Sequence, residues 1–123
     1  MSQAAQDTSA SPSDAWHHTL AQAVATPLSP DRKSALLMSH GSMTLRYYAP
    51  KGVDDQTPHD KDELYIVASG HGGFLRNGER VEFGPGDVLF AAAGDDHRFV
   101  DFSDDFGTWV VFYGAKGGEA ATA

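Results

Sequence analysis

The sequence predicts an all-β domain built as a sandwich, barrel or jelly roll, and three observations carry this prediction. Thirteen glycines and six prolines punctuate the chain. Short runs rich in β-branched and aromatic residues lie between these turn signals, about eight of them at close spacing. The length of 123 residues suits one domain, and the hydrophobic content of 41% is that of a globular protein.

The chain divides into four expected segments. Residues 1–12 are small and polar, and we expect a tail that a partner chain could order. Residues 13–33 are expected to form a short helix and a linker, and residues 34–114 the β domain. Residues 115–123 are expected to be a frayed C-terminal tail.

The short helix is expected to lie against a sheet. Ser11 is a suitable N-cap for it, and Pro27 ends it. Trp16, Leu20 and Val24 recur at intervals of four, so they would form one apolar stripe along the helix. This stripe is the face that we expect to be buried.

Turn signals separate the expected strands. Asn77–Gly78 is the strongest hairpin signal in the chain, and His40–Gly41 marks another hairpin. A tight turn at residues 84–86 precedes a further strand. The expected strands are SALLMS, MTLRYY, ELYIVAS, GFLR, ERVEF, DVLFAA, HRFVDF and TWVVFYG.

The charge balance excludes two classes of partner. Nine Lys and Arg residues against seventeen Asp and Glu residues give a net charge of −8. A nucleic-acid binder needs clustered basic residues that neutralise phosphates, so no nucleic-acid partner is expected. The same balance argues against docking on an anionic membrane, and no apolar run approaches the ~18 residues of a membrane helix. Because the N-terminus shows no secretory signal, the expected location is the cytoplasm.

Two histidines and a glutamate are the residues best placed for chemistry. Without cysteine, thiolate zinc sites and cysteine nucleophiles are excluded, and no phosphate-loop or serine-elbow motif occurs. His59 and Glu63 stand four residues apart at the start of an expected strand, so they project to the same side. His97 opens a later strand after a glycine-rich turn. Two imidazoles and one carboxylate form a metal-binding set that leaves positions open for water, substrate or dioxygen.

The same residues have a second interpretation. Most histidines are surface or core residues, so His59 and Glu63 could form a buried pair that stabilises the fold without a metal. Lys61 lies on the same expected strand face and would compete for the Glu63 carboxylate. Asp95 and Asp96, directly before His97, could orient that ring or could serve only as turn residues.

The spacing around these residues resembles the two signature motifs of the cupin superfamily. The first motif reads G(x)5HxH(x)3–4E(x)6G, and its second histidine, glutamate and last glycine correspond to His59, Glu63 and Gly70. The second motif reads G(x)5PxG(x)2H(x)3N, and its two glycines and histidine correspond to Gly86, Gly94 and His97. The resemblance covers about residues 34–114 and indicates a small single-domain cupin.

The resemblance implies a cupin-type double-stranded β-helix, which is a jelly-roll barrel, with a short helix before it. In cupins the motif residues typically hold Fe, Mn, Ni, Zn or Cu inside the barrel. The resemblance therefore implies a divalent transition metal on His59, Glu63 and His97. Thr57 occupies the position of the family's first histidine, so we expect a water in this fourth position and a more open site than is usual.

A ligand pocket is expected beside this site. If His97 points into the barrel, Phe99 and Asp101 share its strand face. An apolar lining with one charged spot favours a small ligand that offers oxygen atoms to the metal. Trp109 has a second interpretation as core filling, because apolar residues flank it. The candidate pocket residues are Lys61, Tyr65, Phe99, Asp101 and Trp109.

Two functions stay open at this point. The resemblance favours a small metal-dependent enzyme acting on an oxygenated metabolite as a dioxygenase, isomerase or decarboxylase, with no residue assigned as catalytic. The alternative is a non-catalytic module that binds or senses a small molecule, with a weak or absent metal site. Cupins of this size usually pair through strands near the N-terminus, so a homodimer is also expected.

Overall fold

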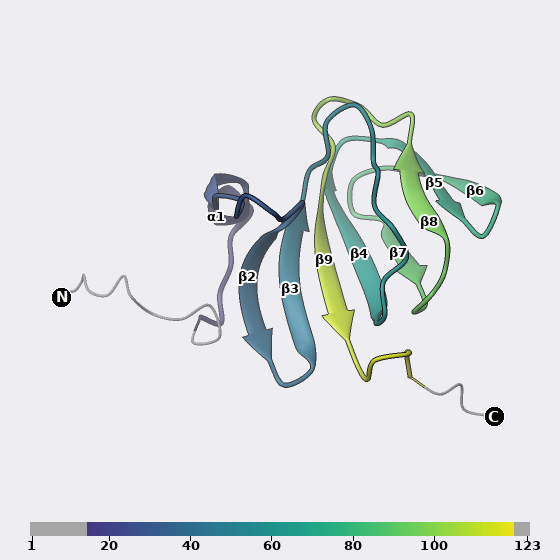
Figure 1. Cartoon of the computed structure of the whole chain (residues 1–123). Helices are drawn as coiled ribbons and strands as arrows, with labels where there is room; N and C mark the ends of the chain where they lie inside the picture. The colour runs from purple at the N-terminus through teal and green to yellow at the C-terminus, as the bar shows by residue number, and fades with distance from the viewer. Residues whose placement is uncertain (1–14, 120–123) are drawn as a thin grey trace.

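The computed structural model describes residues 15–119 and contains one helix and eight strands in this part of the chain (Figure 1). The expected tail at residues 1–12 and the expected helix start at Ser11 lie outside the described residues. All eight expected strands are present, with bounds that differ by at most about two residues. The elements are α1 (Leu20–Ala25), β2 (Ala35–His40), β3 (Met43–Tyr48), β4 (Asp62–Ser69), β5 (Gly72–Arg76), β6 (Glu79–Phe83), β7 (Val88–Ala91), β8 (His97–Val100) and β9 (Gly107–Tyr113).

Two antiparallel sheets make up the fold. The larger sheet has the strand order β2-β3-β9-β4-β7, and the smaller has the order β6-β5-β8. In Figure 1 strands β2, β3, β9 and β4 of the larger sheet run from the left to the centre, and β8, β5 and β6 of the smaller sheet lie on the right, beside β7. Strand β9, the last in sequence, lies between β3 and β4, so it joins the first hairpin, β2-β3, to the rest of the larger sheet. The prediction of an all-β jelly-roll fold is confirmed.

An aromatic core fills the space between the two sheets. The ring of Phe99 on β8 lies 4.9 Å from that of Tyr65 on β4 and 4.7 Å from that of Phe106, measured between ring centres. Such offset and edge-on contacts stabilise the core beyond the area that the rings bury. The buried members of this core are Tyr48, Tyr65, Val67, Phe74, Phe83, Ala91, Phe99, Phe106 and Val110.

Strand β4 sends alternate side chains to opposite faces. Glu63, Tyr65 and Val67 point into the core and are buried, whereas Leu64 and Ile66 face outward. This two-residue period places a carboxylate among aromatic rings, which is costly unless the carboxylate is paired or binds a cation.

The N-terminal helix is shorter than expected. A capping box starts it, in which Thr19 Oγ1 accepts from the Gln22 backbone N–H and Gln22 Oε1 accepts from the Thr19 backbone N–H. Its buried residue is Ala23, which packs with Leu37 and Tyr47 on the outer face of the larger sheet. No helix within residues 15–119 has the length and hydrophobicity that a membrane crossing needs.

The prediction that this helix buries an apolar stripe is wrong. Trp16 precedes the helix and is 93% exposed, and Leu20 and Val24 are also exposed. A helix of six residues has fewer than two turns, so it cannot carry a stripe that spans residues 16–24. The small side chain of Ala23 lets the helix approach the sheet closely, and this contact sets the orientation instead.

Gly70, at the end of β4, is expected to tolerate no side chain. Its φ is +81°, and a Cβ there would lie 2.5 Å from the Phe106 Cα, which is backbone and cannot move aside. Gly78 has a similar φ of +87° but open space around it. We expect Gly78→Ala to lower the free energy of unfolding by about 1 kcal/mol through backbone strain alone. Gly70→Ala should lower it by about 2 to 3 kcal/mol, since the clash adds to the strain.

Urea unfolding of the two variants beside the wild type measures this difference. An equal loss for both would show that the space beside Phe106 adjusts freely and that only the backbone conformation matters at Gly70.

Candidate metal centre

Three elements bring the two histidines and the glutamate together. Glu63 points inward from β4 and is 1% exposed, and His97 begins β8 and is 2% exposed. His59 lies in the segment before β4 and is half-buried. Each of these residues offers one ligand atom, and the three atoms lie within 4.8 Å of one another. The sheets therefore bring His97 to a pair that lies more than thirty residues before it in the sequence.

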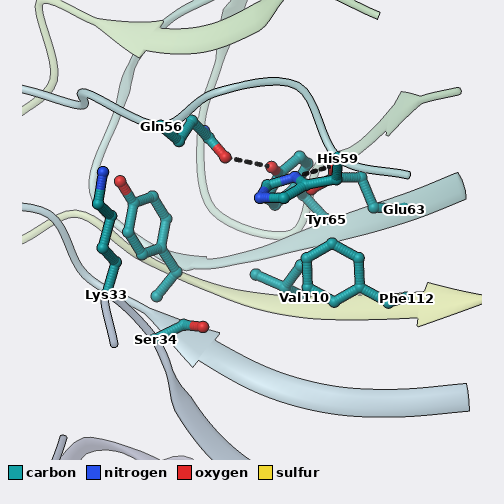
Figure 2. Close-up of a pocket in the computed structure, with 9 residues that line it drawn as sticks. Lys33, Ser34, Gln56, His59, Glu63, Tyr65, Val110 and Phe112 are labelled. Atoms are coloured by element: carbon teal, nitrogen blue, oxygen red, sulfur yellow. Dashed lines mark hydrogen bonds and ion pairs between the residues drawn. The ribbon is translucent and has the colours of Figure 1, made fainter. Parts of the chain in front are cut away.

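The Glu63 carboxylate is paired on one oxygen only. Its Oε2 lies 2.7 Å from His59 Nδ1 (Figure 2). The same oxygen lies 3.1 Å from His97 Nε2. Its Oε1 is buried and has no hydrogen-bond partner among residues 15–119. A buried carboxylate oxygen without a partner is costly, and a cation would remove that cost. Two imidazoles, one carboxylate and this orphaned oxygen therefore fit a divalent transition metal.

The neighbours of Glu63 keep it ionised. Burial opposes ionisation, but hydrogen bonds from His59 and His97 outweigh it and lower the pKa of Glu63 to about 2. Burial lowers the pKa of His97, whereas Glu63 and a backbone carbonyl raise it, and the balance lies above the ordinary value. A carboxylate that is ionised at neutral pH is the form that binds a metal.

The ring of His97 is oriented from the turn before it. His97 Nδ1 lies 2.9 Å from the Asp95 carbonyl oxygen, which can only accept, so Nδ1 carries a proton and donates it there. This leaves Nε2 facing Glu63 and Tyr65. The carboxylate of Asp95 serves the turn, because it accepts from the Ala92 N–H and from Arg76. Asp95 thus orients the His97 ring through its backbone carbonyl oxygen and holds the turn through its side chain.

A pocket adjoins the cluster, and its walls include His59, Glu63, Tyr65, Val110 and Phe112. Gln56 also lines this pocket and was not found from the sequence. Its Nε2 donates to Asp54 Oδ2 at 2.6 Å, and this bond turns its Oε1 toward the pocket. Figure 2 shows that oxygen accepting from the hydroxyl of Tyr65, at 3.2 Å. The Tyr65 hydroxyl also lies 3.1 Å from His97 Nε2. Burial, followed by the charge of Glu63, raises the pKa of Tyr65 well above its usual value, so its hydroxyl stays protonated.

Thr57 does not line the pocket beside the cluster. It is exposed and lines a surface hollow outside the pocket, whereas the preceding residue, Gln56, turns inward. The expectation that Thr57 marks the fourth position therefore needs correction, since Gln56 is the residue of this segment whose oxygen faces the site. Its place directly before the motif's first histidine position is the one signal that could have indicated it.

The other predicted pocket residues divide into two groups. Tyr65 lines the pocket, and Phe99 packs beneath it in the core. Lys61 lies outside, where its Nζ donates to the Ser42 carbonyl oxygen. Asp101 is exposed, with a φ of +51°, and forms an ion pair with Arg80.

Trp109 also lies outside the pocket, on the outer face of the larger sheet beside Tyr47. The strand period explains this, because Val110 and Phe112 take the inward positions on β9 and line the pocket. Both faces of β9 are apolar, so the sequence could not decide between them.

Comparison with known proteins places the fold in a family. A sequence model of the cupin domain matches residues 44–113. The uncharacterized protein SCO3923 of Streptomyces coelicolor is 37% identical over 60 residues, which cover 49% of this chain and 57% of that protein. The HTH-type transcriptional activator RhaS of Mannheimia succiniciproducens is 38% identical over 56 residues, which cover 46% of this chain and 21% of that protein. The match thus spans about half of the first relative and about a fifth of the second.

A solved structure agrees with the match in sequence. The Cupin 2 conserved barrel domain protein from Salinispora arenicola has a TM-score of 0.58 at 21% identity, and the alignment covers 82% of this chain and 91% of that chain. At this identity the likeness concerns the fold alone. The sequence model, in contrast, spans more than half of the residues. This chain belongs to the cupin family.

Proposed function

We propose that this cupin holds a divalent transition metal on His59, Glu63 and His97 and acts on a small oxygenated metabolite in the adjoining pocket. One observation carries the proposal: Glu63, whose buried Oε1 has no partner among the described residues, belongs to a group of three residues whose ligand atoms lie within 4.8 Å of one another. When bound, such a metal supplies Lewis-acid or redox chemistry at a substrate oxygen, as dioxygenase-, isomerase- or decarboxylase-type reactions require.

The pocket residues have separate roles in this proposal. Val110 and Phe112 form an apolar wall for the body of the metabolite (Figure 2). Gln56 offers an acceptor oxygen whose direction Asp54 fixes. Tyr65 offers a proton donor in hydrogen-bond contact with both Gln56 and His97.

The metal content of the purified, untagged protein tests the proposal, before and after incubation with Fe, Mn, Ni, Zn and Cu salts. We expect close to one metal ion per chain in the wild type and in His71→Ala, because His71 is exposed and lies outside the cluster. His97→Ala is expected to lose the metal. A wild type that stays empty with every metal would overturn the proposal. A loaded protein would next be assayed with oxygenated substrates under air and under nitrogen.

A non-catalytic sensing module is the second candidate. The partial match to a transcriptional activator favours it, as does a His59–Glu63 hydrogen bond that is complete without a metal. Tight ligand binding by a metal-free protein without turnover would support this function. Both candidate functions include a homodimer and a cytoplasmic location. Light scattering of the purified protein tests the homodimer.

A further inference from the structure

Positive charge gathers at the mouth of the metal pocket, in a protein whose net charge is −8. A surface hollow adjoins the pocket, and the two share five wall residues, which are Lys33, Ser34, Gln56, His59 and Phe112. Three of the nine basic residues of the chain line this hollow, against one acidic residue, Asp31. The three basic residues are Arg32, Lys33 and Arg46.

Lys33 already has a counter-charge, but in the part of the chain that the structure describes the two arginines do not. Lys33 Nζ lies 2.8 Å from Asp55 Oδ1. The guanidinium of Arg46 donates to the carbonyl oxygen of Ser34 at 3.0 Å. Within residues 15–119, no carboxylate lies within 4.0 Å of a charged nitrogen of Arg46 or Arg32.

Among the described residues, Arg46 is a cation without a counter-charge in a position where this is unusual. It is half-buried, and burial followed by the nearby charge of Arg32 lowers its pKa. An arginine remains charged under these conditions, so the unfavourable interaction persists in the free protein. An anion bound between the two guanidinium groups would relieve it.

The register of the larger sheet aims Arg46 into the barrel. Arg46 on β3 lies opposite Val110 on β9, and Val110 lies opposite Tyr65 on β4. The three residues therefore stand in one row on the inner face. Two strand spacings of about 4.8 Å place the backbone of Arg46 roughly 10 Å from that of Tyr65. A small molecule lying over Val110 would reach both ends of this row.

We propose that the ligand of this pocket is a small anion, whose carboxylate or phosphate group is bound by Arg46 with Arg32 while its other end reaches Tyr65 and the Glu63 cluster. This inference rests on the proposed function, because it takes the pocket beside the metal ligands as the ligand site. It adds that the ligand is negatively charged. A planar guanidinium fork matches both carboxylate and phosphate oxygens, so the two anions share this chemistry.

Titration of the metal-free protein tests the inference, with malonate in one arm and inorganic phosphate in the other. Binding is followed by nuclear magnetic resonance at the side-chain amide of Gln56 and at Nε–H of Arg46. At least one anion is expected to saturate the shifts, and the arm that does so tells whether carboxylate or phosphate is preferred. Arg46→Gln should weaken that binding by about tenfold or more, since it removes a charge-assisted pair.

Arg98→Gln is the matched control, because Arg98 is exposed on β8 and lines neither the pocket nor the hollow. It should bind like the wild type, and Arg46→Lys should restore part of the affinity. If Arg46→Gln does not fold, the exposed Arg32→Gln takes its place. Equal binding by the Arg46 or Arg32 variant and by Arg98→Gln, equal binding of uncharged dimethyl malonate, or no saturation with either anion would each overturn the inference.

The metal proposal is tested separately, by metal content. A protein that binds metal but neither anion would contradict only the inference about the ligand's charge. A protein that binds an anion through Arg46 but never a metal would contradict only the metal proposal.

Discussion

Replacing Glu63 with glutamine is expected to abolish metal binding with little change in the shape of the site. Glutamine keeps the size of the side chain but removes the charge, and it turns one ligand oxygen into an amide nitrogen that cannot bind a metal. Loss of an outer partner of a metal ligand typically costs 10–100-fold in affinity, so loss of Glu63 itself should cost at least about 100-fold. A competition titration with a chelator measures this change, with zinc as the probe.

The same variant gives a second readout, in stability. At a zinc concentration one hundred times its Kd, the wild type should gain about 2.7 kcal/mol in the free energy of unfolding. At that concentration, Glu63→Gln should gain no more than about 0.4 kcal/mol, because its Kd is at least 100-fold higher. Glu79→Gln serves as the control and should behave like the wild type, since Glu79 is exposed on β6 and outside the cluster.

This comparison separates the metal site from a buried pair that only stabilises the fold. In the second case the wild type itself would gain no stability from zinc, and Glu63→Gln would differ from it only in the stability of the metal-free protein. The orphaned Oε1 favours the first case, because a purely structural carboxylate buried to this degree is normally satisfied on both oxygens.

The features that the sequence predicts well depend on local patterns. The turn at Asn77–Gly78 and the strand over residues 63–69 require no knowledge of the rest of the fold, and both are found where they were expected. The grouping of His97 with His59 and Glu63 needed the motif spacing as well, since no local rule joins residues so far apart in the chain.

The features that were missed depend on tertiary contacts. α1 is oriented by Ala23 against Tyr47, a contact between distant segments that outweighs the pattern of large apolar residues. Asp54 and Asp55 are identical neighbours in a loop, yet only Asp54 is buried. Nothing in the sequence distinguishes these two carboxylates, because the difference is made by the groups that surround Asp54 in the fold.

Asp54 connects three parts of the structure. Its Oδ1 accepts from the hydroxyl of Tyr48 at 2.5 Å and from the backbone N–H of Gln56. Its Oδ2 accepts from Gln56 Nε2 and from the backbone N–H of Phe99 at 2.8 Å. One buried carboxylate thereby joins the loop before β4 to strands β3 and β8 and fixes the direction of the Gln56 amide. All its partners are donors, so the network suits an acceptor without a proton.

We therefore expect Asp54→Ala to lower the free energy of unfolding by about 3 to 5 kcal/mol, since it leaves buried donors on Tyr48 and Phe99 without partners. Asp54→Asn should be no milder, because one acceptor oxygen becomes an NH₂ group that faces other donors. Asp55→Ala should leave the urea midpoint essentially unchanged, because Asp55 is exposed and its ion pair with Lys33 lies at the surface.

The Gln56 amide supplies an independent readout of the same network. In the wild type its two N–H signals should be distinct and slow to exchange with water, because Nε2 donates to a buried carboxylate. In Asp54→Asn, examined at a temperature where the variant is still folded, the signals should move toward those of a free glutamine. A variant that keeps both its stability and its Gln56 signals would show that other groups hold the amide. In that event Asp54 would not be the group that directs the oxygen of Gln56 toward Tyr65.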